Sequence, residues 1–157
     1  MQDIIKEAFQ SYDAIVFMGV KGSGKSTTAR AFAQRREMTF LDAEELRSDD
    51  SEDEWLASLN RTLLSHAEKG RKVALAFSAL KEAQRQALAA NGLRLCFALL
   101  EGDIASLEKR TDSGTAESEL AELEVPSDAI RIDIRQHIES IMTYVDFQLI
   151  QMSALSG

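Results

Sequence analysis

The residues best suited to chemistry form one short stretch, Gly19-Val20-Lys21-Gly22-Ser23-Gly24-Lys25-Ser26-Thr27, which fits the pattern G-x-x-x-x-G-K-[ST]. Small residues in this pattern let backbone N–H groups curl around a di- or triphosphate, and the N-terminus of a following helix adds positive potential. Lys25 can then reach the β- and γ-phosphates, and the Ser26 hydroxyl can bind Mg²⁺. The predicted phosphate-binding residues are Gly19, Gly22, Ser23, Gly24, Lys25, Ser26 and Thr27.

The flanks of this stretch support the same interpretation. The apolar run from Ala14 to Met18 precedes it and is typical of a buried strand, and the run from Thr27 to Arg36 is compatible with a helix. A strand before and a helix after form the context in which this motif binds phosphate, whereas an ordinary polar turn needs neither. No N-K-x-D motif of guanine recognition is present, so ATP is the expected nucleotide.

Further apolar runs of strand length alternate with segments of helical spacing. Strands are predicted at residues 14–18, 38–41, 72–77, 94–100 and 129–134. Helices are predicted at residues 3–11, 27–36, 55–69, 80–90, 104–110, 117–123 and from 138 to about 149. This alternation predicts an α/β fold in which helices cover both faces of a five-stranded parallel sheet, giving a three-layer α/β/α domain that spans residues 1–157.

The composition restricts the classes of function. The 157 residues are 45% apolar and suit one domain with a sizeable core. A net charge of −8 argues against a surface that coats nucleic acid. The single cysteine, Cys96, excludes an intramolecular disulfide, and the chain shows neither a signal peptide nor a membrane-spanning run. We therefore expect a cytoplasmic protein with no nucleic-acid or membrane partner.

Residues just after each predicted strand are candidates for the site, because ligands of open α/β sheets bind at the carboxyl ends of the strands. This rule selects Asp42, Ser78 and Glu101. The third strand ends without an acid, so Asp42 is the better candidate to organise metal-bound water and to orient or deprotonate an attacking hydroxyl. An Asp at this position can also cap a helix that begins near Ala43, and the two roles are compatible.

Two pairs of cations are candidates for contacts with substrate or phosphate. Lys81 and Arg85 are four residues apart, a spacing that places both on one face of a helix near the carboxyl edge of the sheet. There they can hold an anionic substrate group or the transferring phosphate, or they can form a solvated surface pair. Lys109 and Arg110 precede the loop at 111–115 and can reach the nucleotide when a lid closes, or simply favour the end of their own helix.

Taken in order, several of these stretches resemble the gluconokinase family of small P-loop kinases, relatives of shikimate kinase and adenylate kinase. Besides the phosphate-binding loop, the resemblance rests on Phe40-Leu41-Asp42-Ala43-Glu44-Glu45-Leu46 and on Ser78-Ala79-Leu80-Lys81 followed by Arg85. The loop is shared by many families, whereas S-A-L-K with the spaced arginine is more particular. Supporting matches are Trp55-Leu56, Leu100-Glu101-Gly102 with Arg110 after it, and Leu123-Glu124.

The resemblance implies a substrate-binding insert, a lid, and transfer of the γ-phosphate of ATP to a sugar-acid hydroxyl. It implies catalytic roles for Lys25, Asp42 and Arg110, with Ser26 and Asp42 serving Mg²⁺. It also implies substrate contacts from Glu44, Lys81 and Arg85.

The chain departs from the family in the two segments that contact the acceptor. The insert, about 43–56, is short, and Glu52 stands about where the family has the arginine of D-R-x-P-W-L. Residues Glu44 to Glu54 contain seven acids against Arg47 alone, so a carboxylate substrate would meet like charge. The lid, about 110–124, lacks the second arginine and the G-H-F-like signature that follow Arg110 in the family.

These observations leave three hypotheses. The first is an ATP-dependent, Mg²⁺-dependent small-molecule kinase with a hydroxylated acceptor of unknown identity. The second is an ATP-binding regulatory or interaction module that descends from such a kinase and transfers little or no phosphate. The third is a kinase for a cationic or macromolecular acceptor that docks on the acidic stretch. Oligomeric state does not follow from the sequence.

Overall fold

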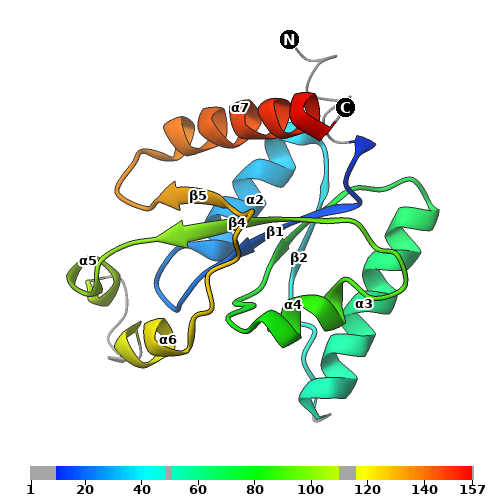
Figure 1. The fold of residues 1–157 in the computed structure, drawn as a ribbon, viewed down its shortest axis with the longest axis horizontal. Coiled ribbons are helices and arrows are strands. Elements are labelled where there is room, and N and C mark those ends of the chain that lie inside the picture. The colour runs from blue at the N-terminus through cyan, green and yellow to red at the C-terminus, as the bar shows by residue number, and fades with distance from the viewer. Residues whose placement is uncertain (1–9, 49–50, 110–115, 157) are drawn as a thin grey trace.

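The computed structural model describes residues 10–48, 51–109 and 116–156. Its centre is a sheet of five parallel strands in the order β2-β3-β1-β4-β5 (Figure 1). The strands are β1 (Ala14–Met18), β2 (Thr39–Asp42), β3 (Val73–Ala76), β4 (Leu95–Glu101) and β5 (Ile130–Asp133). The predicted five-stranded parallel sheet is thus confirmed, and each strand lies within a few residues of its predicted position.

The strand that leads into the phosphate-binding loop, β1, occupies the middle of the sheet. Ala14 pairs with Val73 of β3 on one side and with Leu95 of β4 on the other. All five residues of β1 are buried, as expected for a strand covered by helices on both faces. The loop that follows Met18 is therefore held at the carboxyl edge of the sheet between the ends of two neighbouring strands.

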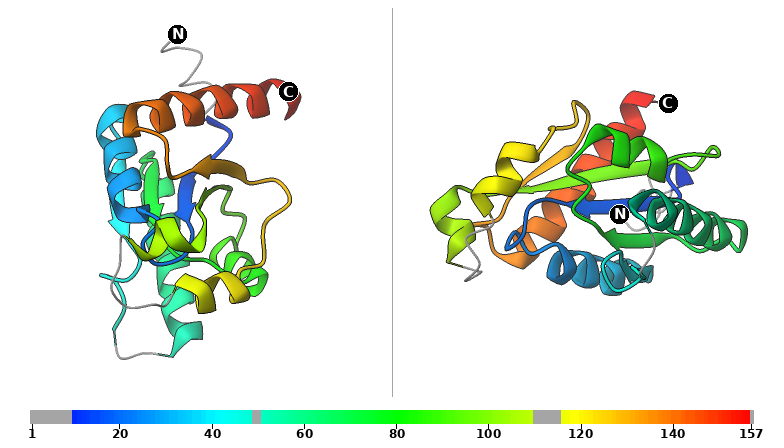
Figure 2. Two further views of the ribbon diagram at one scale, coloured as in Figure 1. Left: turned by 90° about the vertical axis from the view of Figure 1, so that its left-hand side faces the viewer. Right: turned by 90° about the horizontal axis from the view of Figure 1, so that it is seen from below.

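Helices form one layer on each face of the sheet, as the alternating pattern predicts (Figure 2). One face packs α2 (Lys25–Arg36) and α7 (Ile138–Ser156) against Ile15 and Phe17. The other face packs α3 (Glu52–Glu68) and α4 (Glu82–Leu88) against Val16 and Met18. Two short helices, α5 (Ile104–Glu108) and α6 (Ala116–Glu122), lie beyond the carboxyl ends of the strands (Figure 1).

The main differences from the predicted elements lie at helix ends. The helix expected at 80–90 begins only at Glu82, because Lys81 has an extended backbone with φ −103° and ψ 142°. The last helix continues to Ser156, beyond the predicted end near Leu149. The helix predicted at 3–11 lies outside the described residues apart from its last two positions.

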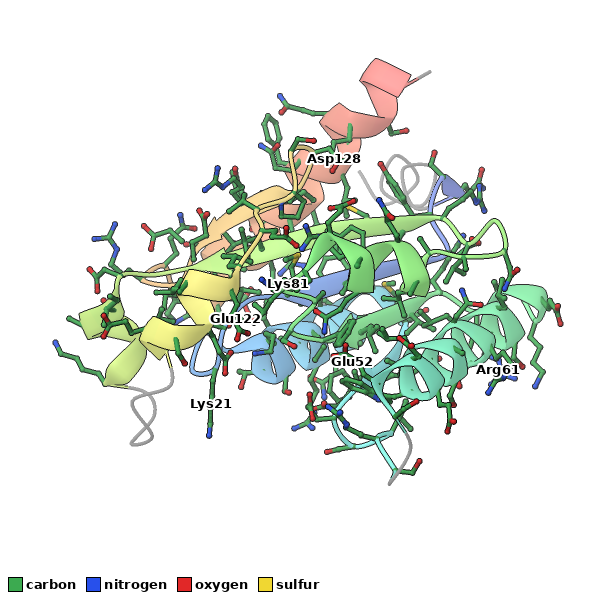
Figure 3. The ribbon with its side chains drawn as sticks, turned by 60° about the horizontal axis from the view of Figure 1, so that its bottom comes forward. Lys21, Glu52, Arg61, Lys81, Glu122 and Asp128 are labelled. Atoms are coloured by element: carbon green, nitrogen blue, oxygen red, sulfur yellow. The ribbon has the colours of Figure 1, made fainter. Side chains whose placement is uncertain are left out.

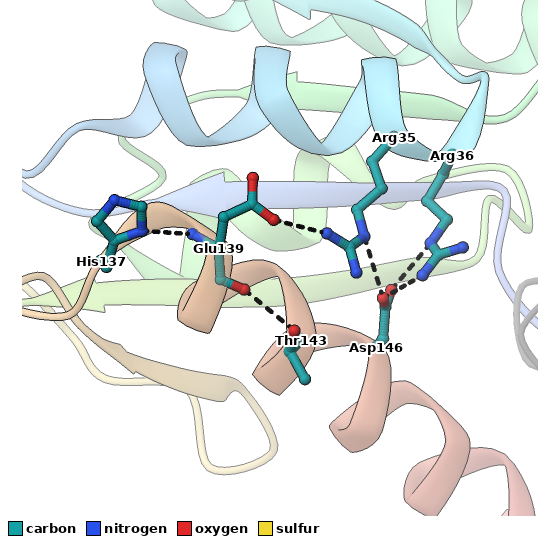
Figure 4. Close-up of polar contacts among 6 residues, drawn as sticks. All are labelled: Arg35, Arg36, His137, Glu139, Thr143 and Asp146. Carbon is teal, nitrogen blue, oxygen red and sulfur yellow. Dashed lines mark hydrogen bonds and ion pairs between the residues drawn. The ribbon is translucent and has the colours of Figure 1, made fainter.

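Ion pairs hold α7 against the end of α2 (Figure 4). Arg36 donates through Nε to Asp146 Oδ1 at 3.0 Å and also contacts Asp146 through Nη2. Arg35 bridges Asp146 at 3.6 Å and Glu139 at 3.1 Å. Asp146 is buried, so its charge requires these partners. At the start of α7, His137 Nδ1 accepts the backbone N–H of Glu139 at 3.2 Å, a structural role at the helix end.

Two further properties bear on the class of protein. Cys96 is buried in the core, and this burial raises the pKa of its thiol to about 12, so the thiol stays protonated. Among the described helices, none combines the length and the apolar character needed to cross a membrane.

Candidate functional site

The phosphate-binding loop takes its shape from glycines at positions where other residues would not fit. Gly24 has φ +93° and immediately precedes α2 as its N-cap residue. At Gly19, with φ +150°, an added Cβ would lie 2.8 Å from Ser23 Oγ and 2.9 Å from the carbonyl oxygen of Leu100. These positions favour glycine because it tolerates positive φ and leaves room for close approach of the backbone.

The loop encloses a cavity of about 400 Å³ at the N-terminus of α2. Its lining residues are Lys21, Gly22, Gly24, Lys25, Ser26 and Thr27. No side chain caps α2 at Gly24, so the backbone N–H groups of the first turn remain available to an anion. Ser23 differs from the other loop residues, because its side chain is buried and its N–H donates to the Val20 carbonyl at 3.1 Å.

Lys25 points back across the loop. Its Nζ donates to the Val20 carbonyl at 3.1 Å. Burial lowers the pKa of this ammonium, while the charges of Glu119, Asp42 and Glu44 oppose the shift. A partly desolvated ammonium whose one hydrogen-bond partner among the described residues is a carbonyl is suited to bind a phosphate oxygen.

Ser26 and Asp42 meet in the pocket although sixteen residues separate them. The Ser26 hydroxyl donates to Asp42 Oδ2 at 2.7 Å, and Asp42 Oδ1 accepts the backbone N–H of Glu44 at 3.0 Å. Asp42 therefore caps the turn that follows β2 and also faces the loop, so both predicted roles fit its position. A hydroxyl and a carboxylate side by side form a donor set that suits Mg²⁺, which binds few protein oxygens and completes its shell with phosphate and water.

The indole of Trp55 fixes the turn that carries Asp42 and Glu44. Its Nε1 donates to the Ala43 carbonyl at 3.0 Å, and its ring meets Phe77 edge-on with centroids 5.3 Å apart. Arg47 covers the same indole, with 4.4 Å between its guanidinium carbon and the ring centroid. The first turn of α3 thus braces the end of β2.

A second cavity, of about 580 Å³, adjoins the first and shares Lys21, Lys25 and Ser26 with it. Asp42 and Glu44 line it from the end of β2, and α6 contributes Glu119 and Glu122. The end of β3, the loop after it and the start of α4 supply the remaining lining residues: Ala76, Phe77, Ser78, Leu80, Lys81 and Gln84. After the roles predicted from the sequence, we call the smaller cavity the nucleotide side and the part of the larger cavity beyond Asp42 the acceptor side.

The two cations predicted to contact substrate lie in different environments. Lys81 lines the acceptor side, whereas Arg85 does not and is 3% exposed. Arg85 donates to the carbonyls of Ala79 and Glu124, each at 2.7 Å, and to Glu82 Oε2 at 2.8 Å. The expectation that Lys81 and Arg85 share a helical face required both to be helical, but Lys81 is the extended residue before α4.

Arg85 instead stabilises the loop that carries Lys81. Ala79 is buried and has φ +48°, a conformation that residues other than glycine rarely adopt. The hydrogen bond from Arg85 Nη1 to the Ala79 carbonyl holds this strained residue in place. The S-A-L-K motif with its spaced arginine thus combines one cation in the pocket with another that positions the loop.

Sequence reasoning missed the carboxylates of α6. Glu119 Oε1 accepts the backbone N–H of Lys21 at 2.8 Å, so α6 reaches the phosphate-binding loop. The helix itself was predicted, but nothing in its sequence shows which element it faces. Of the other candidates, Ser78 lines the pocket, Glu101 pairs with Arg131, and Arg110 lies outside the described residues.

A phosphate-binding loop between the central strand and its helix, with an acid at the end of a nearby parallel strand, defines the fold of a P-loop kinase. Comparison with solved structures agrees. The crystal structure of a gluconokinase from Sinorhizobium meliloti 1021 matches with a TM-score of 0.76 and 27% identity, over 90% of this chain and 93% of that one.

Comparison with curated sequences identifies the family. The probable gluconokinase of Dictyostelium discoideum is 30% identical over 141 residues, which is 72% of this chain and 70% of that protein. The thermoresistant gluconokinase of Escherichia coli K12 is 31% identical over 109 residues, but the match spans only 62% of that protein. No family model matches the chain. The chain belongs to the gluconokinase-like family of P-loop kinases.

Proposed function

We propose that this protein is an ATP-dependent kinase that transfers the γ-phosphate to a hydroxyl group of a small molecule. The observation that carries the proposal is the 2.7 Å hydrogen bond between Ser26 and Asp42, which lies where the two cavities meet. In this arrangement the smaller cavity takes the phosphates of ATP, and the larger one admits the acceptor. The relatives named above are gluconokinases, and their names support the same class of reaction.

In the proposed reaction, the acceptor oxygen forms a bond to the γ-phosphorus while the bond from that phosphorus to the β,γ-bridging oxygen breaks. ADP leaves with the bonding electrons on the bridging oxygen, and the hydroxyl proton passes to the carboxylate of Asp42 and then to solvent. Lys25 stabilises the negative charge on the phosphoryl oxygens. Glu44, just after β2, and Lys81, just before α4, contact the acceptor.

Ser26 and Asp42 would hold Mg²⁺, which would neutralise charge on the β- and γ-phosphates. The described residues contain no cluster of three or more acidic, histidine or cysteine side chains suited to a metal. A site of one hydroxyl and one carboxylate agrees with an ion that arrives with its nucleotide. A binding module without catalysis is not favoured, because the relatives named above are gluconokinases and Lys25, Ser26 and Asp42 lie together in one pocket.

The test measures ADP formation with ATP, Mg²⁺ and a broad panel of polyols, amino alcohols and sugar acids. We expect turnover that depends on one acceptor and is lost in Lys25→Ala and Asp42→Ala. Lys69→Ala is the control for loss of a lysine, because Lys69 is exposed at the end of α3 and lines neither cavity. Saturable ATP binding without acceptor-dependent ADP formation across the panel would instead support the binding module.

A further inference from the structure

We propose that the acceptor is a hydroxyl compound carrying a protonated amine, as in an amino alcohol or amino sugar, and not a sugar acid. This inference rests on the proposed kinase function and adds the chemical class of the second substrate. It follows from the charged side chains that remain on the acceptor side after those that would bind the nucleotide and its metal are set aside.

The nucleotide accounts for most of the cations in the pocket. Lys25 belongs to the phosphates, and Lys21 lines both cavities from the phosphate-binding loop itself. Asp42 belongs to the metal and the attacking hydroxyl. Among the described lining residues of the acceptor side, three carboxylates then remain, from Glu44, Glu119 and Glu122, against the single ammonium of Lys81.

Two of these carboxylates have no hydrogen-bond or ion-pair partner in the described part of the chain. The carboxylate oxygens of Glu44 and Glu122 accept no hydrogen bond and lie in no ion pair there, and both side chains are exposed, although the charge of Glu44 also acts on Lys25. Glu119 has one bond, from the Lys21 N–H. Figure 3 shows Glu122 and Lys81 on the side of the molecule that carries Lys21. Carboxylates that lack partners at a pocket wall can bind an ammonium through charge-assisted hydrogen bonds.

Two donors near the acceptor side that could otherwise bind an acid group, Arg85 and Gln84, are already engaged. Arg85 is buried behind the wall and bonded to Ala79, Glu82 and Glu124. The amide of Gln84 is held at both ends: its Nε2 donates to Glu52 Oε1 at 2.8 Å, and its Oε1 accepts the Lys81 N–H at 3.1 Å. A carboxylate on the acceptor side would therefore lose water and face three like charges, and Lys81 is the one cation among the described lining residues outside the phosphate-binding loop.

Glu52 contributes to this outcome without lining the pocket. It occupies the place where the resemblance puts an arginine of the acceptor site, and it holds Gln84 from the start of α3. With Glu52 in place of an arginine, the insert therefore also occupies the amide of Gln84 at the start of α4. The amine itself takes no part in the bond changes, because it stays protonated while the hydroxyl is phosphorylated.

Three compounds with one carbon skeleton test the proposal. D-Gluconate, D-glucitol and 1-amino-1-deoxy-D-glucitol differ only at C1, which is a carboxylate, an alcohol or an ammonium. Their affinities are measured calorimetrically on the protein saturated with Mg²⁺ and a non-hydrolysable ATP analogue. We expect the amine to bind at least fivefold more tightly than the alcohol, and the acid to bind most weakly.

Variants of α6 test whether the carboxylate of Glu122 causes the preference for the amine. Glu122→Gln should reduce the advantage of the amine over the alcohol about threefold, and Glu122→Lys should move the preference toward D-gluconate. Glu117→Gln is the matched control, because Glu117 is exposed on the same helix and does not line the pocket. An advantage of the amine that is unchanged in Glu122→Lys would overturn the role given to this wall.

The outcomes separate this inference from the proposed function. Tighter binding of D-gluconate than of the amine, or no binding of any of the three, would overturn the inference. In either case the kinase function would still stand if some acceptor in the wider panel produced ADP in a Lys25-dependent manner. Loss of that turnover for every acceptor would overturn the kinase function itself.

Discussion

The two sides of the pocket differ in the groups that line them, which are mainly backbone groups on one side and side chains on the other. The nucleotide side consists of one continuous loop, and its binding groups are backbone N–H groups fixed by glycines and by the start of α2. The acceptor side consists of side chains from β2, the loop after β3, α4 and α6. A side made of backbone tolerates little change in sequence, whereas a side made of side chains can change its charge residue by residue. The second kind of construction allows one kinase fold to accept different substrates.

The strongest test of the nucleotide side is Lys25→Met. Removal of the ammonium should lower kcat/KM on the order of 10³-fold, because no other described cation occupies its place beneath the phosphates. Steady-state kinetics with the best acceptor measures this effect, and calorimetry with ATP shows how much of it is binding. A rate within tenfold of the wild type would mean that the loop does not stabilise the transferring phosphoryl group.

Asp42→Asn tests the residue that both sides share. An amide keeps the size of the side chain and can still accept from the N–H of Glu44, but it cannot take a proton. We expect kcat to fall about 10²-fold or more, while ATP affinity in the absence of Mg²⁺ should not fall, because the variant removes a negative charge beside the phosphate-binding loop. An unchanged kcat would remove Asp42 from catalysis and leave it only the capping of its turn.

Arg85→Met and Lys81→Met form a matched pair that separates stabilisation of the loop after β3 from contact with the acceptor. Arg85→Met should lower the free energy of unfolding by about 3 kcal/mol, because the buried carbonyl of the strained Ala79 and the part-buried carbonyl of Glu124 lose a charged donor. Lys81→Met should change stability by less than about 0.5 kcal/mol, since its side chain is exposed, but should weaken turnover. Urea denaturation and kinetics of both variants give the comparison, and equal losses of stability would contradict it.

The smallest expected effect concerns the contact between the two sides. Glu119→Gln removes a negative charge from a carboxylate that is hydrogen-bonded to the phosphate-binding loop. ATP affinity measured without acceptor should therefore rise about fivefold, which corresponds to about 1 kcal/mol. Glu122→Gln is the control, because Glu122 lines the same pocket without a hydrogen bond to the loop. Equal effects of the two variants would show that only the summed charge matters.

The sequence predicted the fold and the elements that flank the phosphate-binding loop well, because both depend on local patterns. The run from Ala14 to Met18 indicates a strand buried on both faces, and the glycine spacing after it specifies the loop. The position of Asp42 followed from the rule that parallel strands present their carboxyl ends at one edge of the sheet. Each of these inferences needs only neighbouring residues and one general property of parallel sheets.

The acceptor side could not be predicted in the same way. The spacing of Lys81 and Arg85 suggested a shared helical face, but the helix begins one residue after Lys81. The contact of Glu119 with Lys21 joins positions 98 residues apart, and no local pattern encodes it. Charge composition did indicate that the acceptor segment is acidic, although only the structure shows which carboxylates reach the pocket.

The residue that follows α6 by two positions gives this helix a fixed point. Glu124 is bonded three times to the loop after β3 and to α4: its N–H donates to Leu80, its carbonyl accepts from Arg85, and its carboxylate accepts the N–H of Glu82. One end of α6 is thus pinned to the acceptor side, while Glu119 reaches the phosphate-binding loop. While the three bonds of Glu124 hold, α6 can leave that loop only by pivoting about its C-terminal end, and not by moving as a whole.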